Sequence, residues 1–179
     1  GRFYMVNDWR LDHSLRVPRP DCSRQLGTPN ACNAAGCHAD RSVAWAVEKY
    51  DAWYGKTRKP HYGTVLAAGH EGRPDAGPEL VRLAQDQLRP AIARATAVEL
   101  LSRFPGESTT ATLEKALVDD DALIRQTAAS SLRPADPARL ARALVPLLKD
   151  PVRAVRTASA ARLAEVPPGL LTQAHRATL

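Results

Sequence analysis

The sequence is poor in aromatic residues, has a single methionine and contains no long apolar run. Aromatic residues make up 5% of its 179 residues, although 44% are hydrophobic. The core must therefore consist mostly of Ala, Leu and Val. This composition favours closely packed helices over a β-sandwich, whose strands prefer β-branched and aromatic residues. Because no apolar run approaches the roughly 20 residues that cross a bilayer, we expect no transmembrane segment.

Negative charge is also in short supply, and the chain is basic. Lys and Arg total 25 against 19 Asp and Glu, a formal net charge of +6. A basic protein can bind nucleic acid, anionic lipid or an acidic protein. The basic residues are spread along the chain without a dense block, which is typical of solvated helix faces. We therefore expect no nucleic-acid partner.

The few cysteines and histidines are concentrated near the N-terminus. All three cysteines lie in the first 40 residues, and only one histidine lies beyond residue 70. The residues concerned are Cys22, Cys32, Cys37, His13, His38, His61 and His70, with His175 as the exception. We therefore expect ligand chemistry in the first part of the chain.

Residues 1–77 are predicted to form a first domain with much irregular chain. Several prolines and glycines prevent a long helix before Cys32. A helix is expected over residues 40–54, capped by Asp40 and ended by Gly55, because Val43, Val47, Tyr50 and Tyr54 share one helical face. A shorter helix is expected over 62–68. Residues 69–77 are rich in Gly, Pro and Asp and are expected to form a linker.

Residues 78–179 repeat with a period of 31 residues. The period relates Arg94, Arg125 and Arg156, and it relates Leu101, Leu132 and Leu163. Weaker columns are Ile92 (shifted by one), Ile124 and Val155; Ala97, Ala128 and Ser159; Val98, Ala129 and Ala160; and Leu117 with Leu148. Each unit is predicted to be one helix, a short Asp- or Pro-containing turn, and a second helix.

A fixed period with matching small residues is typical of an α-solenoid, whose units bury their faces against neighbouring units. The pattern resembles short HEAT-like repeats over about residues 79–168. The alternative is an ordinary amphipathic helical bundle. The predicted fold is all-α: a haem-binding segment followed by a short HEAT-like solenoid.

The strongest chemical motif is Cys32-Asn-Ala-Ala-Gly-Cys37-His38. A c-type haem needs two thiols for its thioether bonds and an imidazole directly after the second cysteine as proximal iron ligand. The usual spacing is C-x-x-C-H, and here it is C-x4-C-H. Small residues in the longer loop leave room for the porphyrin.

Two other interpretations use the same residues. Cys22, Cys32, Cys37 and His38 could form a Cys₃His zinc site, although structural zinc sites favour two C-x₂₋₄-C pairs and only one is present. A disulfide in an oxidising compartment would leave one cysteine unpaired. Cys22 itself is expected to be a small buried residue without a ligand role.

The sequence around the motif resembles a known family. It contains DHSLRVPRPD at 12–21, LGTPNAC at 26–32, CHAD at 37–40, WYG at 53–55 and HYG at 61–63. These stretches are similar to the last haem segment of periplasmic multihaem cytochromes related to cytochrome c nitrite reductase, in a branch where helical repeats follow. The resemblance covers about residues 2–70 directly and the repeats more loosely.

The resemblance implies a covalent haem c that carries electrons in the periplasm or outside the cell. The repeats would then dock a redox protein or an adjacent cytochrome subunit, in an oligomer or a larger multihaem assembly. The relatives' catalytic haem has no counterpart in this chain, so nitrite reduction is not carried over. The alternatives are a scaffold module with a structural or vestigial haem, and the electron-transfer part of a multihaem oxidoreductase.

The sequence offers one proximal iron ligand, His38, and several candidates for the sixth ligand. The abundance of histidine favours a second imidazole, from His61 or His13, and we expect low-spin iron of low potential. In the relatives the residue matching His13 serves an earlier haem, which favours His61. Met5, His70 and another chain are the remaining candidates, and Trp9, Tyr50, Trp53 and Tyr54 are candidates for lining the haem edge.

Overall fold

The computed structural model describes residues 3–4, 10–11, 18–33 and 38–178. In this part of the chain the regular structure is helical, except for two strands of two residues each. Strand β1 (Phe3–Tyr4) pairs antiparallel with β2 (Arg10–Leu11). The all-α class expected from the composition is confirmed.

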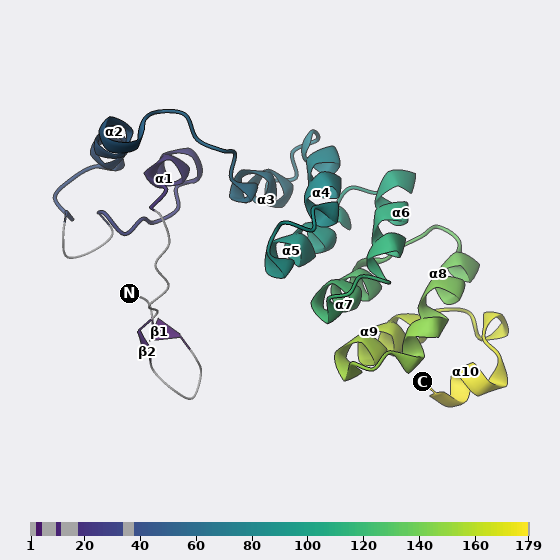
Figure 1. Ribbon diagram of the computed structural model, residues 1–179. Helices are drawn as coiled ribbons and strands as arrows, with labels where there is room; N and C mark the ends of the chain where they lie inside the picture. Colours follow the sequence, from purple (N-terminus) through teal and green to yellow (C-terminus); the bar gives the residue numbers. More distant parts are fainter. Residues whose placement is uncertain (1–2, 5–9, 12–17, 34–37, 179) are drawn as a thin grey trace. The chain divides into compact units, whose positions relative to one another are not determined.

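The chain divides into two compact units, residues 1–59 and residues 60–179 (Figure 1). The first contains β1, β2, α1 (Pro20–Leu26) and α2 (Val43–Tyr54). The second contains α3 (Tyr62–His70), α4 (Ala76–Gln85), α5 (Ala91–Leu101), α6 (Glu107–Ala116), α7 (Ala122–Ser131), α8 (Pro137–Leu144), the 3₁₀ helix η1 (Val145–Lys149), α9 (Arg153–Leu163), the 3₁₀ helix η2 (Pro168–Leu170) and α10 (Gln173–Thr178). Among the described helices, none combines the length and the apolar character needed to cross a membrane.

Helix α2 begins later than expected. Its N-cap is Ser42, whose hydroxyl accepts a hydrogen bond from the Trp45 N–H at 3.2 Å. The exposed carboxylate of Asp40, the expected cap, instead pairs with Arg41. The helix ends as expected at Gly55, which has a φ of 78° that side-chain-bearing residues rarely adopt.

The first unit is held together by ion pairs between its two helices and the segment after α2. Arg19 binds the carboxylate of Asp21 in α1 at 2.7 Å. Arg58 pairs with Asp51 of α2 and approaches Asp21 to 4.0 Å. The guanidinium of Arg58 also lies over the Tyr50 ring, 4.6 Å from its centroid. These contacts fix α2, and with it the chain just before α2, relative to α1.

The expected linker over 69–77 is wrong at its start, because α3 runs through Gly69 to His70 and is part of the second unit. Gly69 is buried, and a Cβ there would lie 3.0 Å from Leu80 Cδ1 and 3.1 Å from Leu100 Cδ1. The missing side chain allows α3 to pack against α4 and α5. The second unit therefore begins at Pro60, ahead of the boundary expected after residue 77.

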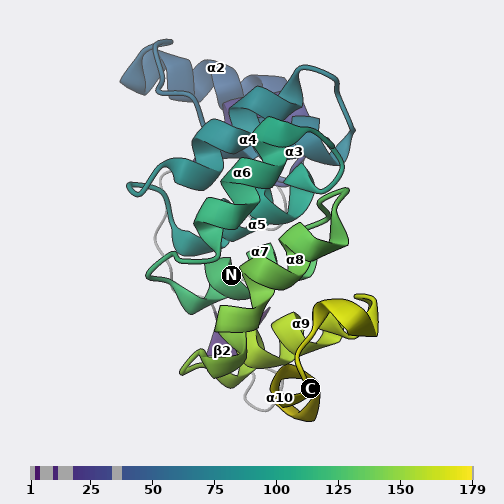
Figure 2. The same cartoon turned by 90° about the vertical axis from the view of Figure 1, so that its right-hand side faces the viewer.

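Three helical pairs follow one another in the second unit: α4 with α5, α6 with α7, and α8 with α9. The helices α4, α6 and α8 lie in one layer and α5, α7 and α9 in the other (Figures 1 and 2). Within the second layer α5 packs on α7 and α7 on α9. Helix α8 continues into η1 through Pro146.

The core follows the 31-residue period. Leu101, Leu132 and Leu163 have no exposed surface, and neither do Ala97, Ala128 and Ser159. One expected column is wrong by one residue. Ile92 is 64% exposed, and the buried residue that aligns with Ile124 and Val155 is Ala93.

Candidate functional site

Cys32 lies in a turn that Asn30 holds in place. The side-chain oxygen of Asn30 accepts hydrogen bonds from the N–H groups of Cys32 (2.9 Å) and Asn33 (3.3 Å). The Cys32 thiol is half-buried and free. The amide nitrogen Nδ2 of Asn30 is buried and has no partner among the described residues. Cys37 lies outside the described residues.

His38 lies on the chain that leads into α2, and its side chain is exposed. Its ring packs against Trp45 in the first turn of α2, with 4.8 Å between ring centroids. Arg41 lies on the same indole, 5.8 Å from the centroid, and donates its N–H to the His38 carbonyl. The imidazole is therefore accessible to a ligand and oriented by one aromatic contact.

Sequence reasoning missed both supporting residues. Asn30 is recognisable from sequence, because an asparagine side chain in a turn often accepts hydrogen bonds from the N–H groups two and three residues further along the chain. Trp45 gave no such signal, because its contact with His38 depends on α2 beginning at Val43 rather than at Asp40.

The described residues fit a covalent haem. An accessible thiol and an accessible imidazole are the donor types that attachment and proximal ligation require. The buried Nδ2 of Asn30, which has no partner among the described residues, is a hydrogen-bond donor close to Cys32 in the chain and is suited to an anionic group. A buried donor without a partner is costly unless something binds it.

The structure bears on the zinc and disulfide interpretations only at Cys22, Cys32 and His38, because Cys37 lies outside the described residues. Cys22 is buried in α1, and burial raises the pKa of its thiol, with the nearby Asp21 carboxylate acting in the same direction. A metal ligand must lose that proton. Cys22 and Cys32 are both free thiols. Across the described ranges no group of three or more His, Cys, Asp and Glu side chains is gathered as in a metal site.

Of the candidate distal ligands, His61 has a local role in the structure. It is the N-cap of α3, and its Nδ1 accepts a hydrogen bond from the Gly63 N–H at 3.0 Å. In this orientation the neutral ring carries its proton on Nε2, the nitrogen that would have to bind iron. His61 belongs to the second unit and His38 to the first, and the pairing of the two as iron ligands stays a prediction.

The other ligand candidates are placed only in part. His13 and Met5 lie outside the described residues. His70 is the exposed last residue of α3. Among the aromatic candidates, Tyr50 packs against Tyr54 with 4.7 Å between centroids, while Trp53 is 73% exposed. Trp9 also lies outside the described residues.

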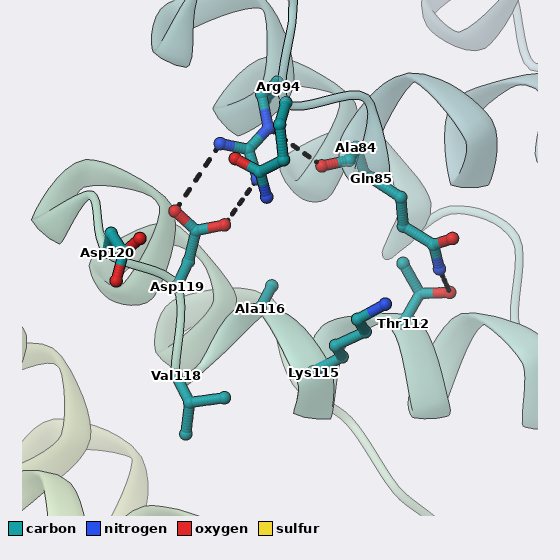
Figure 3. A pocket seen from close by; sticks show the side chains of 10 residues that line it. Ala84, Gln85, Arg94, Thr112, Lys115, Ala116, Val118, Asp119 and Asp120 are labelled. Carbon is teal, nitrogen blue, oxygen red and sulfur yellow. Dashed lines mark hydrogen bonds and ion pairs between the residues drawn. The ribbon is translucent and has the colours of Figure 1, made fainter.

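The second unit contains a row of alternating charges that we term the arginine–aspartate ladder: Arg94, Asp119, Arg125, Asp150 and Arg156. Arg94 donates from Nε to the Ala84 carbonyl at 3.1 Å and pairs through Nη1 and Nη2 with Asp119 (Figure 3). Arg125 binds Asp150 with two hydrogen bonds, from Nε at 2.8 Å and from Nη2 at 3.1 Å. Each pair joins one helical pair to the next and spans 25 residues.

Comparison of the chain with models of protein families, with curated proteins and with solved structures finds no match.

Proposed function

We propose that this chain is a c-type cytochrome that carries electrons in the periplasm or outside the cell, with its single haem bonded to Cys32 and Cys37 and ligated by His38. The observation that carries the proposal is the donor set: a free, half-buried Cys32 and an exposed His38, which are the first and last residues of the C-x4-C-H motif in the sequence. When bound, the haem supplies one-electron redox chemistry. Asn30 and Trp45 support this donor set in two different ways.

Asn30 holds the Cys32 backbone in its turn and offers its amide nitrogen to an anionic group. Trp45 packs against the exposed His38 ring and favours one orientation of it. The apolar indole also lowers the polarity around the proximal ligand, which tunes the potential of a haem.

The second unit is proposed to be a short HEAT-like solenoid that docks a redox protein or an adjacent cytochrome subunit. Its support is the row of helical pairs joined by the arginine–aspartate ladder, with buried residues at the 31-residue period. A solenoid presents an extended surface to partners. If the protein carries no functional haem, this unit leaves the scaffold function as the alternative.

The test is haem content in the protein produced by a host that attaches haem c. We expect one covalent haem per chain, seen as a haem-stained band at the mass of the chain in denaturing electrophoresis and as one equivalent by the pyridine haemochrome spectrum. Cys32→Ala should remove one thioether bond and shift the haemochrome band. Cys22→Ala is the matched control and should change neither readout, because Cys22 is buried in α1.

Two results would contradict the haem proposal. One is a colourless protein with one equivalent of zinc that Cys22→Ala abolishes. The other is a colourless protein with a Cys32–Cys37 disulfide identified by peptide mass spectrometry.

A further inference from the structure

Arg156 occupies the third arginine position of the ladder and is anchored in the same way as Arg125. Arg125 donates from Nη1 to the carbonyls of Asp119 and Asp120, at 2.8 and 2.9 Å. Arg156 donates from Nη1 to the carbonyls of Asp150 and Pro151, at 2.8 and 3.0 Å. Both guanidinium groups are therefore fixed by the turn that precedes their own helix.

The two arginines differ at the other edge of the guanidinium. In Arg125 this edge, Nε and Nη2, binds the carboxylate of Asp150. In Arg156 the same edge has no carboxylate partner among the described residues, and the side chain is only half-buried. An anchored guanidinium presents a planar pair of donors that matches a carboxylate, with little conformational entropy left to lose.

The surrounding face of α9 is open as well. Two positions of the 31-residue repeat show this. Ala95 of α5 is buried, whereas the equivalent Thr157 of α9 is exposed. Val98 and Ala129 are fully buried, whereas the equivalent Ala160 of α9 is half-buried. Helix α9 carries the exposed Arg153 and the half-buried Arg156 in its first turns, whereas its third arginine, Arg162, is buried and pairs with Glu165. This face therefore has positive charge and uncovered small residues.

We infer that Arg156 is a carboxylate-binding site, and that the face of α9 around it docks an acidic protein segment whose Asp or Glu side chain takes the place that Asp150 has on Arg125. The occupant is a protein carboxylate because the chain itself fills the equivalent edge of Arg125 with one. The inference rests on the docking role proposed for the second unit and is independent of the haem.

The test uses a peptide with the sequence of residues 107–122 as the probe. This segment contains α6 and the Asp119 turn, which supplies the carboxylate to Arg94, and its five acidic residues outnumber its one lysine. Binding to the full chain is followed by the NMR signals of the arginine Nε–H groups. The control probe is the same peptide with Asp119→Asn.

We expect the Arg156 Nε–H signal to shift on addition of the peptide, and the Asp119→Asn peptide to bind about tenfold more weakly. Arg156→Lys in the protein keeps the charge but loses the planar donor pair, so it should remove this difference between the peptides. Arg153→Lys, in an exposed arginine on the same helix, should retain it.

Equal binding of the two peptides, or an unchanged preference in Arg156→Lys, would overturn the inference, as would no binding at millimolar peptide. Tighter binding of a single-stranded oligonucleotide at the same signal would assign the site to phosphate instead. Self-association that Arg156→Lys abolishes, measured by sedimentation, would make a second copy the occupant. Haem content is measured separately, so a colourless protein that passes this test would contradict only the proposed electron transfer.

Discussion

In the structure His61 is the N-cap of α3, and the distal-ligand role predicted for it would compete for the same ring. As N-cap of α3 its Nδ1 is a hydrogen-bond acceptor, whereas iron ligation through Nε2 leaves the proton on Nδ1. One residue cannot do both at once. Asn is among the best N-cap residues and is a poor haem ligand, so His61→Asn separates the roles.

If His61 is the distal ligand, we expect His61→Asn to convert low-spin iron to a high-spin form that binds carbon monoxide when reduced, with α3 still capped. His61→Ala should give the same spectrum and cost about 1 kcal/mol of stability in addition. Visible spectra and thermal unfolding measure the two effects. An unchanged spectrum in His61→Asn, together with a high-spin spectrum in His13→Asn, would move the distal role to His13.

Ser159 is a polar residue in an apolar column. It has no exposed surface, its hydroxyl has no hydrogen-bond partner in the part of the chain that the structure describes, and alanine occupies the two equivalent positions, Ala97 and Ala128. A buried hydroxyl without a partner destabilises the folded state. We therefore expect Ser159→Ala to raise the free energy of unfolding of the second unit by about 1 kcal/mol. Urea denaturation measures the change, and a loss of stability would contradict it.

At the scale of helices, the two glycines Gly69 and Gly77 make opposite predictions for the same substitution. Both lie in helices, where alanine is favoured by about 1 kcal/mol. A Cβ on Gly77 would meet its nearest neighbour, Phe104 Cβ, at 3.6 Å, an ordinary contact, whereas on Gly69 it would approach Leu80 to 3.0 Å.

We expect Gly77→Ala to stabilise the second unit by about 0.5–1 kcal/mol. Gly69→Ala should destabilise it by about 1–3 kcal/mol, because the added methyl group forces α3 away from α4 and α5. Thermal unfolding of the two variants side by side is the measurement. If both substitutions stabilise, the contact of α3 with the stack is looser than the structure indicates.

The helical repeats were predictable from sequence to the extent that side-chain type marked them. The arginine and leucine columns marked α5, α7 and α9, the second helix of each pair. The prediction was wrong at Ile92 because an apolar residue need not be buried, and the smaller Ala93 occupies the buried position between closely packed helices. Gly69 misled for the opposite reason, since glycine marks a close helix contact as well as a loop.

For the candidate site, the sequence points to Cys32 and His38 because haem chemistry sets the residue types, and this assignment stays a prediction. The ladder was predictable from sequence only in part. Its arginines recur with the 31-residue period, and so do Asp119 and Asp150, which sequence reasoning missed. Pairing across 25 residues depends on how the helical pairs stack, which local patterns do not contain.

For the molecule as a whole, the ladder predicts how stability responds to acid. Burial raises the pKa of Asp119, but hydrogen bonds from Arg94 and from the Asp121 N–H outweigh it, and the net pKa lies below the ordinary value. The hydrogen bonds from Arg125 likewise lower the pKa of Asp150. A lowered carboxyl pKa contributes stability that is present above the unfolded value of about 3.9 and lost as the pH falls through the folded value.

We therefore expect the free energy of unfolding to fall steeply below about pH 4. Asp150→Asn should lower stability at neutral pH by about 3 kcal/mol, because it leaves Arg125 without its counter-charge, and it should flatten the acid dependence. Asp120→Asn is the control, since Asp120 is exposed and its carboxylate makes no hydrogen bond to the residues that the structure describes. Guanidinium denaturation at several pH values gives the profiles, and parallel profiles for Asp150→Asn and the unaltered chain would contradict the prediction.

The ladder also bears on how such a chain can change over evolutionary time. Each aspartate serves the arginine 25 residues before it, while the units recur every 31 residues. Loss of residues 119–149 would bring Asp150 to the position of Asp119, in register with Arg94, and duplication of the same stretch would add one more matched pair. Because the arginine–aspartate pair at the new junction keeps the 25-residue spacing of the existing pairs, a single unequal recombination can shorten or lengthen the protein by one whole unit. Insertions of any other length would break the register, so variation in length is expected to occur in steps of one unit.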